Sequence, residues 1–291
     1  MKEQIEAVRR MQDYIADHLG EDITPADLAR VSLYSPWYAY RLFTRWLART
    51  PADYIRRLRL SQSALRLRNG DRKVTDVAFE VGFSSVDGYQ RAFYREFGCN
   101  PGEYAARPVP LYLFTPYRLM DQTTEKEKQM EKTRTVFVQA VEKPARQVLI
   151  QRGVQAKDYY AYCEEVGCDV WGLLLSIRDT LGEPVGMWLP ARYVKPGTSE
   201  YVQGVEMASD YAGDIPQGLD RLALPAATYL MFRGEPFAED DYEEAIGEIW
   251  EAERKFDPAT AGYAWDDANP RIQLAPEGER GYIELMPVRK A

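Results

Sequence analysis

Two copies of one sequence pattern, about 50 residues apart, constrain what the first 107 residues can fold into. A shift of 50 residues matches Ser35 with Ser85, Arg41 with Arg91, Phe43 with Phe93, Arg45 with Arg95, Pro51 with Pro101, and Tyr54 with Tyr104. Ala29 matches Ala78 at a shift of 49, so the copies differ by one residue in the turn between these positions. A repeat of this kind predicts two copies of one supersecondary unit.

Each copy is predicted to form a helix–turn–helix unit. A short helix, expected at residues 26–31 and 74–81, is followed by a tight turn. The second helix begins after a serine cap, near Ser35 in the first copy and near Ser84 and Ser85 in the second. Gly82 suits the second turn, because glycine adopts a positive φ at little cost. One helix at about residues 52–69 joins the copies, so the two second helices can enter successive major-groove turns about 34 Å apart.

The charge distribution supports DNA binding once the chain is divided. The 291 residues carry a formal net charge of −8, which as an average argues against a nucleic-acid-binding protein. Residues 1–107 hold 17 basic and 14 acidic side chains, whereas residues 108–291 hold 20 and 31. Nine arginines and one acid fall within residues 28–68. This run predicts contact with DNA, and a solvated helix face is the alternative explanation.

The same residues resemble the DNA-binding signature of the AraC/XylS family over about residues 5–107. The first half is carried by Leu28-Ala29, Ser35-Pro36-x-Tyr38-x-x-Arg41-Leu42-Phe43 and Pro51-x-x-Tyr54-Ile55. The second half is carried by Val77-Ala78-x-x-x-Gly82-Phe83-Ser84, Arg91-x-Phe93 and Gly98-x-x-Pro101-x-x-Tyr104. The resemblance implies that DNA is contacted by side chains of the two second helices, namely Trp37, Tyr40, Arg41, Arg45, Asp87, Gly88, Arg91 and Arg95.

Arg41 and Arg91 are the strongest candidates for base contacts in this set. Each carries the forked guanidinium that can donate two hydrogen bonds to guanine O6 and N7, and pairing with local acids is the alternative role. Gly88 departs from the family, which usually has a larger side chain there, and Asp87 repels phosphate. The second unit is therefore expected to contribute less base readout or to bind in a shifted register.

Residues 108–134 are expected to form a linker, and residues 135–291 a second domain of class α+β. Strand patterns occur at residues 147–150, 185–189, 201–207, 228–232, 271–274 and 282–286, with helical patterns at 158–181 and 240–256. A shift of 81 relates residues 145–153 to residues 226–234. A helix with Trp171 or Trp250 follows each, and a strand with Glu206 or Glu284 closes each half. The predicted unit is βαββ, used twice around a cleft.

The closing strand places an unusual carboxylate beside apolar side chains. Period-2 alternation puts Tyr282, Glu284 and Met286 on one face, and Ile283 and Leu285 on the other, where they are expected to lie against the helices. A carboxylate in such surroundings is costly to ionise unless a positive or hydrogen-bonding group meets it. Two interpretations of Glu284 follow: a solvated side chain on an exposed face, or a pocket carboxylate that pairs with a cationic or amine-bearing apolar ligand.

This second part resembles the gyrase-inhibitor-like (GyrI-like) effector-binding domain over about residues 135–289. The resemblance is carried by Lys143-Pro144-Ala145-Arg146, Arg233-Gly234, Ile249-Trp250, Gly262-Tyr263 and Tyr282-Ile283-Glu284-Leu285-Met286-Pro287-Val288. It implies a duplicated βαββ fold that binds small, often lipophilic and cationic molecules in a central cleft, with Glu284 as the pocket carboxylate. The ligand-binding candidates are Glu284, Tyr282, Met286, Glu206, Tyr229, Trp188 and Trp171. The domain order resembles the right-origin-binding type of AraC/XylS regulator.

The combined prediction is a transcriptional regulator that binds double-stranded DNA and a small effector, with RNA polymerase as a further candidate partner. Two alternatives stay open: a GyrI-like hydrolase that uses Glu284 with Tyr282 or Tyr229, and a module that binds polymerase or gyrase. No cofactor, metal site or catalytic residue is predicted, since three cysteines without a CxxC pair and the lone His18 form no such pattern. The sequence has no long apolar run and no apolar leader, which predicts a cytoplasmic protein without membrane contact.

Overall fold

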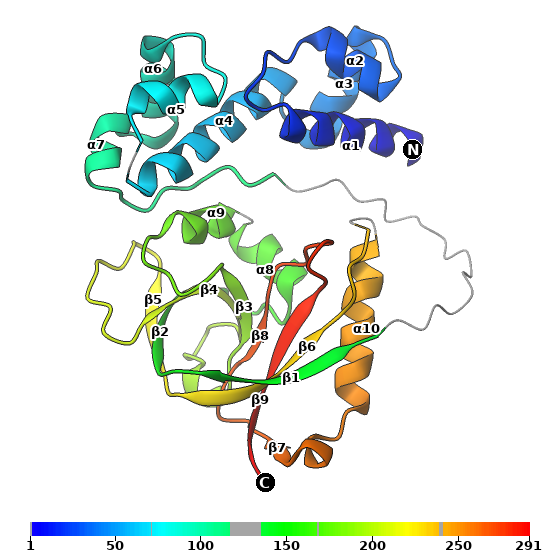
Figure 1. Cartoon of the computed structure of the whole chain (residues 1–291), viewed down its shortest axis with the longest axis vertical. Helices are drawn as coiled ribbons and strands as arrows, with labels where there is room; N and C mark the ends of the chain where they lie inside the picture. Colours follow the sequence, from blue (N-terminus) through cyan, green and yellow to red (C-terminus); the bar gives the residue numbers. More distant parts are fainter. Residues whose placement is uncertain (1, 71, 117–134, 168, 239–240) are drawn as a thin grey trace. The chain divides into compact units, whose positions relative to one another are not determined.

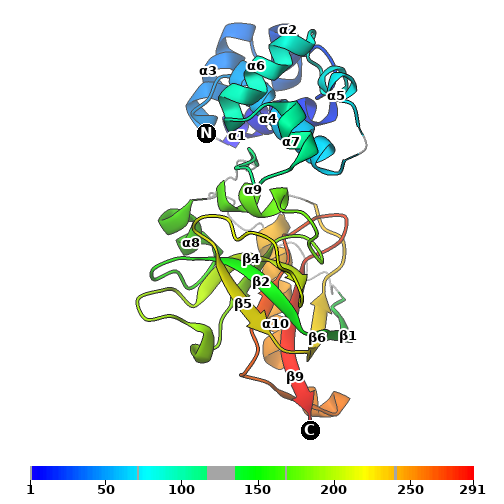
Figure 2. The same ribbon diagram turned by 90° about the vertical axis from the view of Figure 1, so that its left-hand side faces the viewer.

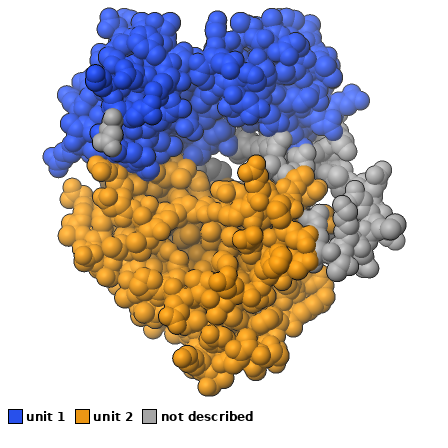
Figure 3. All heavy atoms as spheres, in the orientation of Figure 1, with its two compact units in different colours: residues 1–129 blue, residues 130–291 orange. Residues whose placement is uncertain are grey.

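The computed structural model divides into two units, residues 1–129 and 130–291, and each is described by itself (Figures 1 and 3). It describes all residues except 1, 71, 117–134, 168 and 239–240. Most of the predicted linker, including its charged stretch at residues 121–133, therefore lies outside the described residues. Within the described part of the predicted linker, Leu111 and Leu113 are buried, and the ring of Phe114 packs edge-on against Tyr54.

The first unit is helical and contains both predicted helix–turn–helix units (Figures 1 and 2). Its helices are α1 (Lys2–Asp17), α2 (Pro25–Ser32), α3 (Pro36–Leu47), α4 (Pro51–Arg68), α5 (Val74–Glu80), α6 (Val86–Phe97) and α7 (Pro101–Ala106). Helices α2 and α3 form the first helix–turn–helix unit, α5 and α6 form the second, and α4 joins them. The repeated residues Phe43, Phe93, Tyr54 and Tyr104 are buried, so the matched aromatic positions build the core.

Serine caps begin the second helix of each unit, as the repeat predicts. The Oγ of Ser35 accepts a hydrogen bond from the amide of Tyr38 at 3.4 Å. The Oγ of Ser85 accepts one from the amide of Gly88 at 3.2 Å. Because the amides of a first helical turn have no partner inside the helix, these caps define where α3 and α6 start.

The turns of the two units are closed by the same hydrogen bond, and the second copy has one more residue between that bond and its serine cap. The amides of Tyr34 and Phe83 donate to the carbonyls of Ala29 and Ala78 at 3.3 and 3.0 Å, respectively. The additional residue of the second copy is Ser84, which lies between this bond and the cap of α6. The repeat therefore accommodates its one-residue difference after the turn without altering the turn itself.

The guanidinium of Arg59 connects three segments of the first unit. From α4, its Nε donates to the carbonyl of Leu19 at 2.9 Å and its Nη1 to the carbonyl of Gly82 at 2.8 Å, and its Nη2 donates to the carbonyl of Glu21. Gly82 has φ +85°, and a Cβ atom there would lie 2.7 Å from the Cζ of Arg59. The second turn thus needs glycine both for its left-handed backbone and for the close approach of Arg59.

The second unit is an antiparallel sheet with helices, which confirms the α+β prediction at that level (Figure 2). Its described strands are β1 (Phe137–Lys143), β2 (Arg146–Arg152), β3 (Val185–Trp188), β4 (Tyr201–Ala208), β5 (Asp220–Leu224), β6 (Ala227–Arg233), β7 (Tyr263–Trp265), β8 (Arg271–Gln273) and β9 (Ile283–Lys290). The helices are α8 (Tyr159–Val166), α9 (Asp169–Ser176) and α10 (Tyr242–Lys255), with 3-10 turns at Ala191–Tyr193 and Pro258–Ala261. The strand order is β1-β6-β9-β8-β3-β4-β2-β5, and β7 pairs with β9.

The strand predictions are correct but incomplete. The six predicted strands correspond to β2, β3, β4, β6, β8 and β9, whereas β1, β5 and β7 were not predicted. Strand β1 is largely exposed, so it lacks the alternation that marks a half-buried strand. The helical pattern at residues 158–181 corresponds to two short helices. Helix α8 ends at Val166, before Gly167 with its φ of +94°, and α9 ends at Ser176, short of the predicted end.

The faces of β9 differ from one expectation. Tyr282 and Met286 pack with Ile249 of α10, so the face that carries Glu284 is the helix-facing one. Ile283 and Leu285 pack in the apolar cluster on the opposite face of the sheet, and their expected position against the helices is wrong. Alternation along a strand fixes which residues share a face, and it does not say which face a helix covers.

Replacing Gly82 by Ala should destabilise the chain by about 1–3 kcal/mol, because the new Cβ strains the backbone and pushes Arg59 off its carbonyl partners. Gly98→Ala is the matched control. Its φ is +74°, yet no atom lies within 4 Å of the position that a Cβ would take there, so the cost should be about 1 kcal/mol. Urea unfolding of both variants measures the difference, and equal losses would show that Arg59 does not constrain the turn.

Candidate DNA-binding surface and candidate ligand site

Helix α3 presents four predicted DNA-contacting residues on one exposed face. Trp37 and Tyr40 are 66% and 48% exposed, which is unusual for large aromatic side chains, and Arg41 and Arg45 are exposed beside them. The guanidinium of Arg41 lies over the ring of Trp37, with its Cζ 4.6 Å from the ring centre. This cation–π contact holds Arg41 in place while leaving its donors free to face outward.

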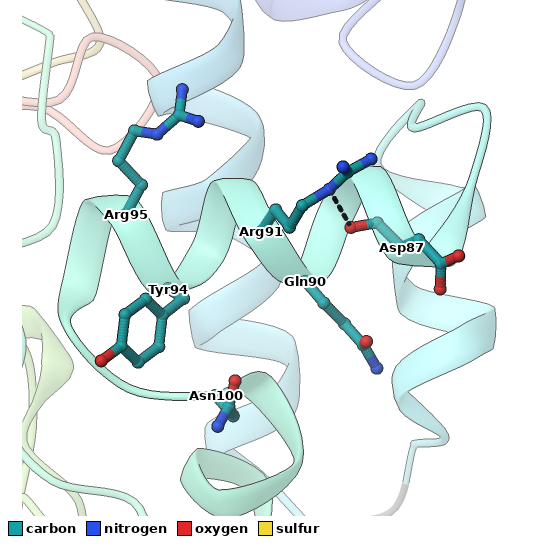
Figure 4. A pocket seen from close by; sticks show the side chains of 6 residues that line it. All are labelled: Asp87, Gln90, Arg91, Tyr94, Arg95 and Asn100. Carbon is teal, nitrogen blue, oxygen red and sulfur yellow. Dashed lines mark hydrogen bonds between the residues drawn. The ribbon is translucent and has the colours of Figure 1, made fainter.

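Helix α6 presents the corresponding face of the second unit (Figure 4). A hollow of about 960 Å³ on this surface is lined by Asp87, Gln90, Arg91, Tyr94, Arg95 and Asn100. The Nε of Arg91 donates to the backbone carbonyl of Asp87 at 3.3 Å. Arg91 and Arg95 point to one side of α6, and Gln90 and Tyr94 to the other.

Sequence reasoning missed Gln90, Tyr94 and Asn100 as parts of this surface. The signal was available for Gln90, because the 50-residue shift maps the predicted Tyr40 onto it. A glutamine amide can donate and accept together, as recognition of adenine in the major groove requires. The same shift maps Thr44 onto Tyr94, so α6 has a larger side chain at that corresponding position.

Most other arginines of the basic run bind within the protein. Arg57 of α4 donates to Glu96 of α6 at 2.5 Å, and Arg66 pairs with Glu80 at 3.0 Å. By contrast, neither Arg41 nor Arg91 forms an ion pair with any described residue. Further pairs of the run join Arg30 with Asp27, and Arg49 and Arg56 with Asp53. Some arginines of the run therefore form internal ion pairs, and a minority of them face outward.

Gly88 lies where the cap of α6 leaves little room. A Cβ on Gly88 would lie 2.8 Å from the Oγ of Ser85, which accepts the Gly88 amide. The first unit has Tyr38 at the corresponding position, where the Tyr38 amide donates to the Oγ of Ser35, so the cap by itself does not require glycine. Asp87 beside Gly88 is exposed at the start of α6.

In the second unit, one face of the four central strands brings together several predicted ligand-binding residues. Trp188 on β3 pairs in register with Tyr201 on β4 and with Arg271 on β8. Gln273 on β8 pairs in register with Glu284 on β9. We call these side chains the central array, comprising Trp188, Tyr201, Arg271, Gln273, Tyr282 and Glu284.

Glu284 is fully buried, so the interpretation of a solvated glutamate is wrong. Its carboxylate accepts hydrogen bonds from the Nε1 of Trp250 at 2.7 Å, the hydroxyl of Tyr282 at 2.5 Å and the Nε of Arg271 at 2.5 Å. The positive group that the sequence argument assigned to a ligand is thus supplied by the chain itself. Arg271 was missed, because nothing in the sequence indicates which cation meets this carboxylate.

Arg271 lies between two tryptophans and two carboxylates. Its Cζ is 4.6 Å from the ring centre of Trp188 and 6.0 Å from that of Trp250. Its Nη2 approaches Glu284 and lies 2.9 Å from the Oε2 of Glu253 on α10. The Arg271 side chain keeps 28% of its surface exposed, so it lies at the outer edge of the central array.

The tyrosines of the array are held protonated by burial. Burial raises the pKa of Tyr282, and the adjacent Glu284 carboxylate raises it further. Burial likewise raises the pKa of Tyr201, whose hydroxyl accepts from the Nε2 of Gln273 at 2.9 Å. Gly186 leaves room for that hydroxyl, because a Cβ there would collide with it. Both hydroxyls can therefore serve as hydrogen-bond donors.

Glu206 and Tyr229 form a separate network. Glu206 pairs in register with Val148, which places it on the opposite face of the sheet from Glu284. It accepts from the Nζ of Lys143 and the Nε of Arg146, both at 2.6 Å, and the Nη2 of Arg146 donates to the hydroxyl of Tyr229 at 3.1 Å. Of the remaining candidates, Met286 packs in the apolar cluster under α10, and Trp171 lies half-buried on α9.

Among the described residues, no group of three or more His, Cys, Asp or Glu side chains is placed to hold a metal ion. Cys99 and Cys163 form no disulfide bond with a described residue, and Cys168 lies outside the described residues. In the part of the chain that the structure describes, no helix has both the length and the apolar character to cross a membrane.

Two helix–turn–helix units joined by one helix, each with an exposed second helix, define the class of a DNA-binding protein. A family model described as a helix-turn-helix domain matches residues 28–107. Regulatory protein SoxS of Escherichia coli (strain K12) is 35% identical over 100 residues, covering 33% of this chain and 94% of SoxS. The chain belongs to the AraC family and is a DNA-binding transcriptional regulator of AraC type.

Two further similarities have more limited coverage or strength. The right origin-binding protein of Escherichia coli (strain K12) is 31% identical over 101 residues, which is 35% of each chain. A solved structure described as "The structure of SAV2435 bound to TETRAPHENYLPHOSPHONIUM" covers 53% of this chain and 94% of its own, with a TM-score of 0.35 and 13% identity. A similarity of that strength carries no argument about the ligand of this chain.

The carboxyl group of Glu253 should make stability depend on pH. Burial, reinforced by the Glu284 carboxylate and opposed by Arg271, raises the pKa of Glu253 from 4.5 to about 8. Between these values the unfolded chain loses a proton that the folded chain keeps, so stability falls as the pH rises from about 5 to about 8. Relative to Glu253→Gln, the wild type should lose about 1–3 kcal/mol across this window in urea unfolding.

The control for this pH dependence is Glu251→Gln, which removes an exposed carboxylate from the same helix. It should leave the wild-type fall in place. If the wild type and Glu253→Gln had parallel stability profiles, Arg271 would already hold Glu253 ionised and the explanation would be wrong.

Proposed function

We propose that the exposed faces of α3 and α6 read DNA bases in the major groove, with Arg41 and Arg91 as the principal base-contacting residues. The observation that carries this proposal is that both guanidinium groups are exposed and form no ion pair with the described residues, whereas most arginines around them do. Trp37 and Tyr40 add exposed aromatic surface beside Arg41 for contact with base edges and sugars. Arg45 and Arg95, one turn further along each helix, are placed to contact phosphates.

The two reading helices differ in chemistry. On α6, Asp87 repels phosphate near the start of the helix, while Gln90 and Arg91 offer an amide and a guanidinium to adjacent bases. Gly88 has no side chain to contribute. We therefore assign the second unit a narrower base readout than the first.

Arg41→Ala and Arg91→Ala should each weaken sequence-specific binding by about 1–3 kcal/mol, because each would remove a two-bond contact to a base. The measurement is filter binding to a duplex that the full chain selects from a random-sequence pool, at fixed salt. Arg66→Ala is the control, since its guanidinium pairs with Glu80 and should contribute little to DNA binding. Recovery of no sequence-selective duplex, or unchanged affinity in both arginine variants, would refute the assignment.

The second unit is proposed to be a GyrI-like effector-binding domain built from two βαββ halves. The strand order supports this, because from the two edges inward it runs β1, β6, β9, β8 on one side and β5, β2, β4, β3 on the other. The same shift of 81 residues that relates the two sequences relates Tyr201 to Tyr282, which both approach Gln273. By this register Glu284 corresponds to Gln203 and not to Glu206.

The proposed effector is a small, lipophilic cation that binds at the central array. The observation that carries this proposal is a fully buried carboxylate, Glu284, beside the indole rings of Trp188 and Trp250. Such a site lowers the free energy of a poorly hydrated cation through charge pairing and cation–π contact together. Regulation then requires that the effector bind differently to the DNA-bound and free forms of the chain.

Binding is favoured over hydrolysis by the contacts of Glu284. Its carboxylate already accepts from Trp250, Tyr282 and Arg271, so its lone pairs are engaged and it is a poor general base in this arrangement. Mass spectrometry of a bound ligand after long incubation separates the two roles. Recovery of the intact molecule supports a sensor, and stoichiometric conversion supports the hydrolase alternative.

Tetraphenylphosphonium should bind the full chain, and tetraphenylborate should not, because these ions share size and shape but carry opposite charge. Calorimetric titration measures both. Glu284→Gln should weaken tetraphenylphosphonium binding by about tenfold or more, since the buried charge that attracts the cation is lost. Glu251→Gln, on the exposed face of α10, should bind like the wild type. Equal binding of the two ions would mean that the site recognises their apolar surface and not their charge, which would contradict the proposal.

A further inference from the structure

Arg271 has the surroundings that a bound cationic ligand would have. Its guanidinium pairs with the buried Glu284 carboxylate and lies 4.6 Å from the ring centre of Trp188. Trp250 lies near both partners, since its indole donates to Glu284 and its ring centre is 6.0 Å from the Cζ of Arg271. An aromatic, carboxylate-bearing cage of this kind is suited to a delocalised, weakly hydrated cation.

We propose that Arg271 is a built-in occupant of the effector site, whose guanidinium must leave the Glu284 carboxylate when a cationic effector binds. The proposal rests on the proposed function of the second unit and adds the residue that controls access to it. In the unliganded chain, Arg271 satisfies Glu284. In the liganded chain, the effector takes over that role, and Arg271 moves outward into solvent.

The two ends of this ion pair differ in how freely they can move. Glu284 is fully buried on the long strand β9, and Tyr282 beside it is 1% exposed. Arg271 belongs to the three-residue strand β8, and 28% of its side-chain surface is exposed. Rotation about its flexible side chain would free the cage without breaking a backbone hydrogen bond.

A second arginine of the same unit shows what a fixed guanidinium looks like. Arg146 is 2% exposed and is held by Glu206, the carbonyl of Pro144 and the hydroxyl of Tyr229. Its polar partners surround it, and one ring, that of Tyr229, lies near it at 5.7 Å. Arg271 also pairs with two carboxyl groups, those of Glu284 and Glu253, but it lies beside two indole rings and keeps 28% of its side-chain surface exposed, as the displaceable member of a pair would.

This arrangement favours cationic ligands over neutral or anionic ones. Removing Arg271 without a replacement cation leaves the buried carboxylate of Glu284 unpaired, which is strongly unfavourable. A neutral or anionic molecule therefore cannot displace Arg271, whereas a delocalised cation restores the lost pairing. The apparent affinity for such a cation is lowered by the fraction of molecules in which Arg271 still fills the cage.

The first test fills the vacated cage with a small cation and needs no effector. Full-length Arg271→Gln is heated with and without millimolar ethylguanidinium, alongside the wild type and Arg280→Gln. Arg280 is the matched control, because it pairs with Glu183, has a similarly exposed side chain at 25%, and lies outside the array. Ethylguanidinium should raise the Tm of Arg271→Gln and leave the other two unchanged. An equal shift in Arg271→Gln and Arg280→Gln would overturn the proposal.

The second test measures tetraphenylphosphonium affinity by calorimetry. Arg271→Gln should bind at least about tenfold more tightly than the wild type, because the competing guanidinium is gone. Arg271→Lys, which keeps a competing charge, should bind more weakly than Arg271→Gln, and Arg280→Gln should match the wild type. Equal or weaker binding by Arg271→Gln would refute self-occupancy while leaving the effector site standing. If none of the four proteins bound the cation, the proposed effector function would fail. The ethylguanidinium test would still show whether a guanidinium group occupies the site beside Glu284.

Discussion

The fold of the DNA-binding unit depends on one guanidinium, that of Arg59, and on the backbone carbonyls it binds. It joins the segment after α1, the turn of the second helix–turn–helix unit and α4 through three hydrogen bonds. Removing this donor would take away the hydrogen-bond partner of carbonyls in two other segments, and with it the links between those segments and α4. Arg57 links α4 to α6 as well, because its Nε donates a hydrogen bond to Glu96 of α6. The position of α6 thus depends on arginines that form hydrogen bonds within the protein.

Because arginines of the basic run form these internal contacts, only part of the run is available to contact DNA. A net excess of three basic side chains in residues 1–107 is a small charge for a DNA-binding domain, and ion pairs with Asp53, Glu80 and Glu96 engage part of the run. Long-range attraction to the phosphate backbone should therefore be weak, and affinity should depend on a few well-placed contacts. Trp37 holds the guanidinium of Arg41 over its ring, so the position of this guanidinium is set within the protein.

The sequence was most informative where it repeats. The 50-residue shift located the second helix of each helix–turn–helix unit and its serine cap, and it also maps Tyr40 onto Gln90, which the predicted set of contacting residues lacks. It did not reveal that Leu33 has φ +63° where the second copy has Gly82, because a strained leucine leaves no pattern. In the second unit, alternation identified the face of Glu284 but not Arg271, since ion pairs between β8 and β9 depend on register, and register is set by the whole sheet.

The register of the sheet also decides which carboxylate lies beside the tryptophans. Glu206 and Glu284 look equivalent in sequence, yet pairing with Val148 and with Phe232 places them on opposite faces. The shift of 81 residues maps Gln203, which is buried and neutral, onto Glu284. A symmetric pair of carboxylates in one site would repel each other and stay partly protonated. One carboxylate and one amide avoid that cost within the sheet, whereas Glu253 of α10 does lie near Glu284, and burial together with the Glu284 charge raises the pKa of Glu253.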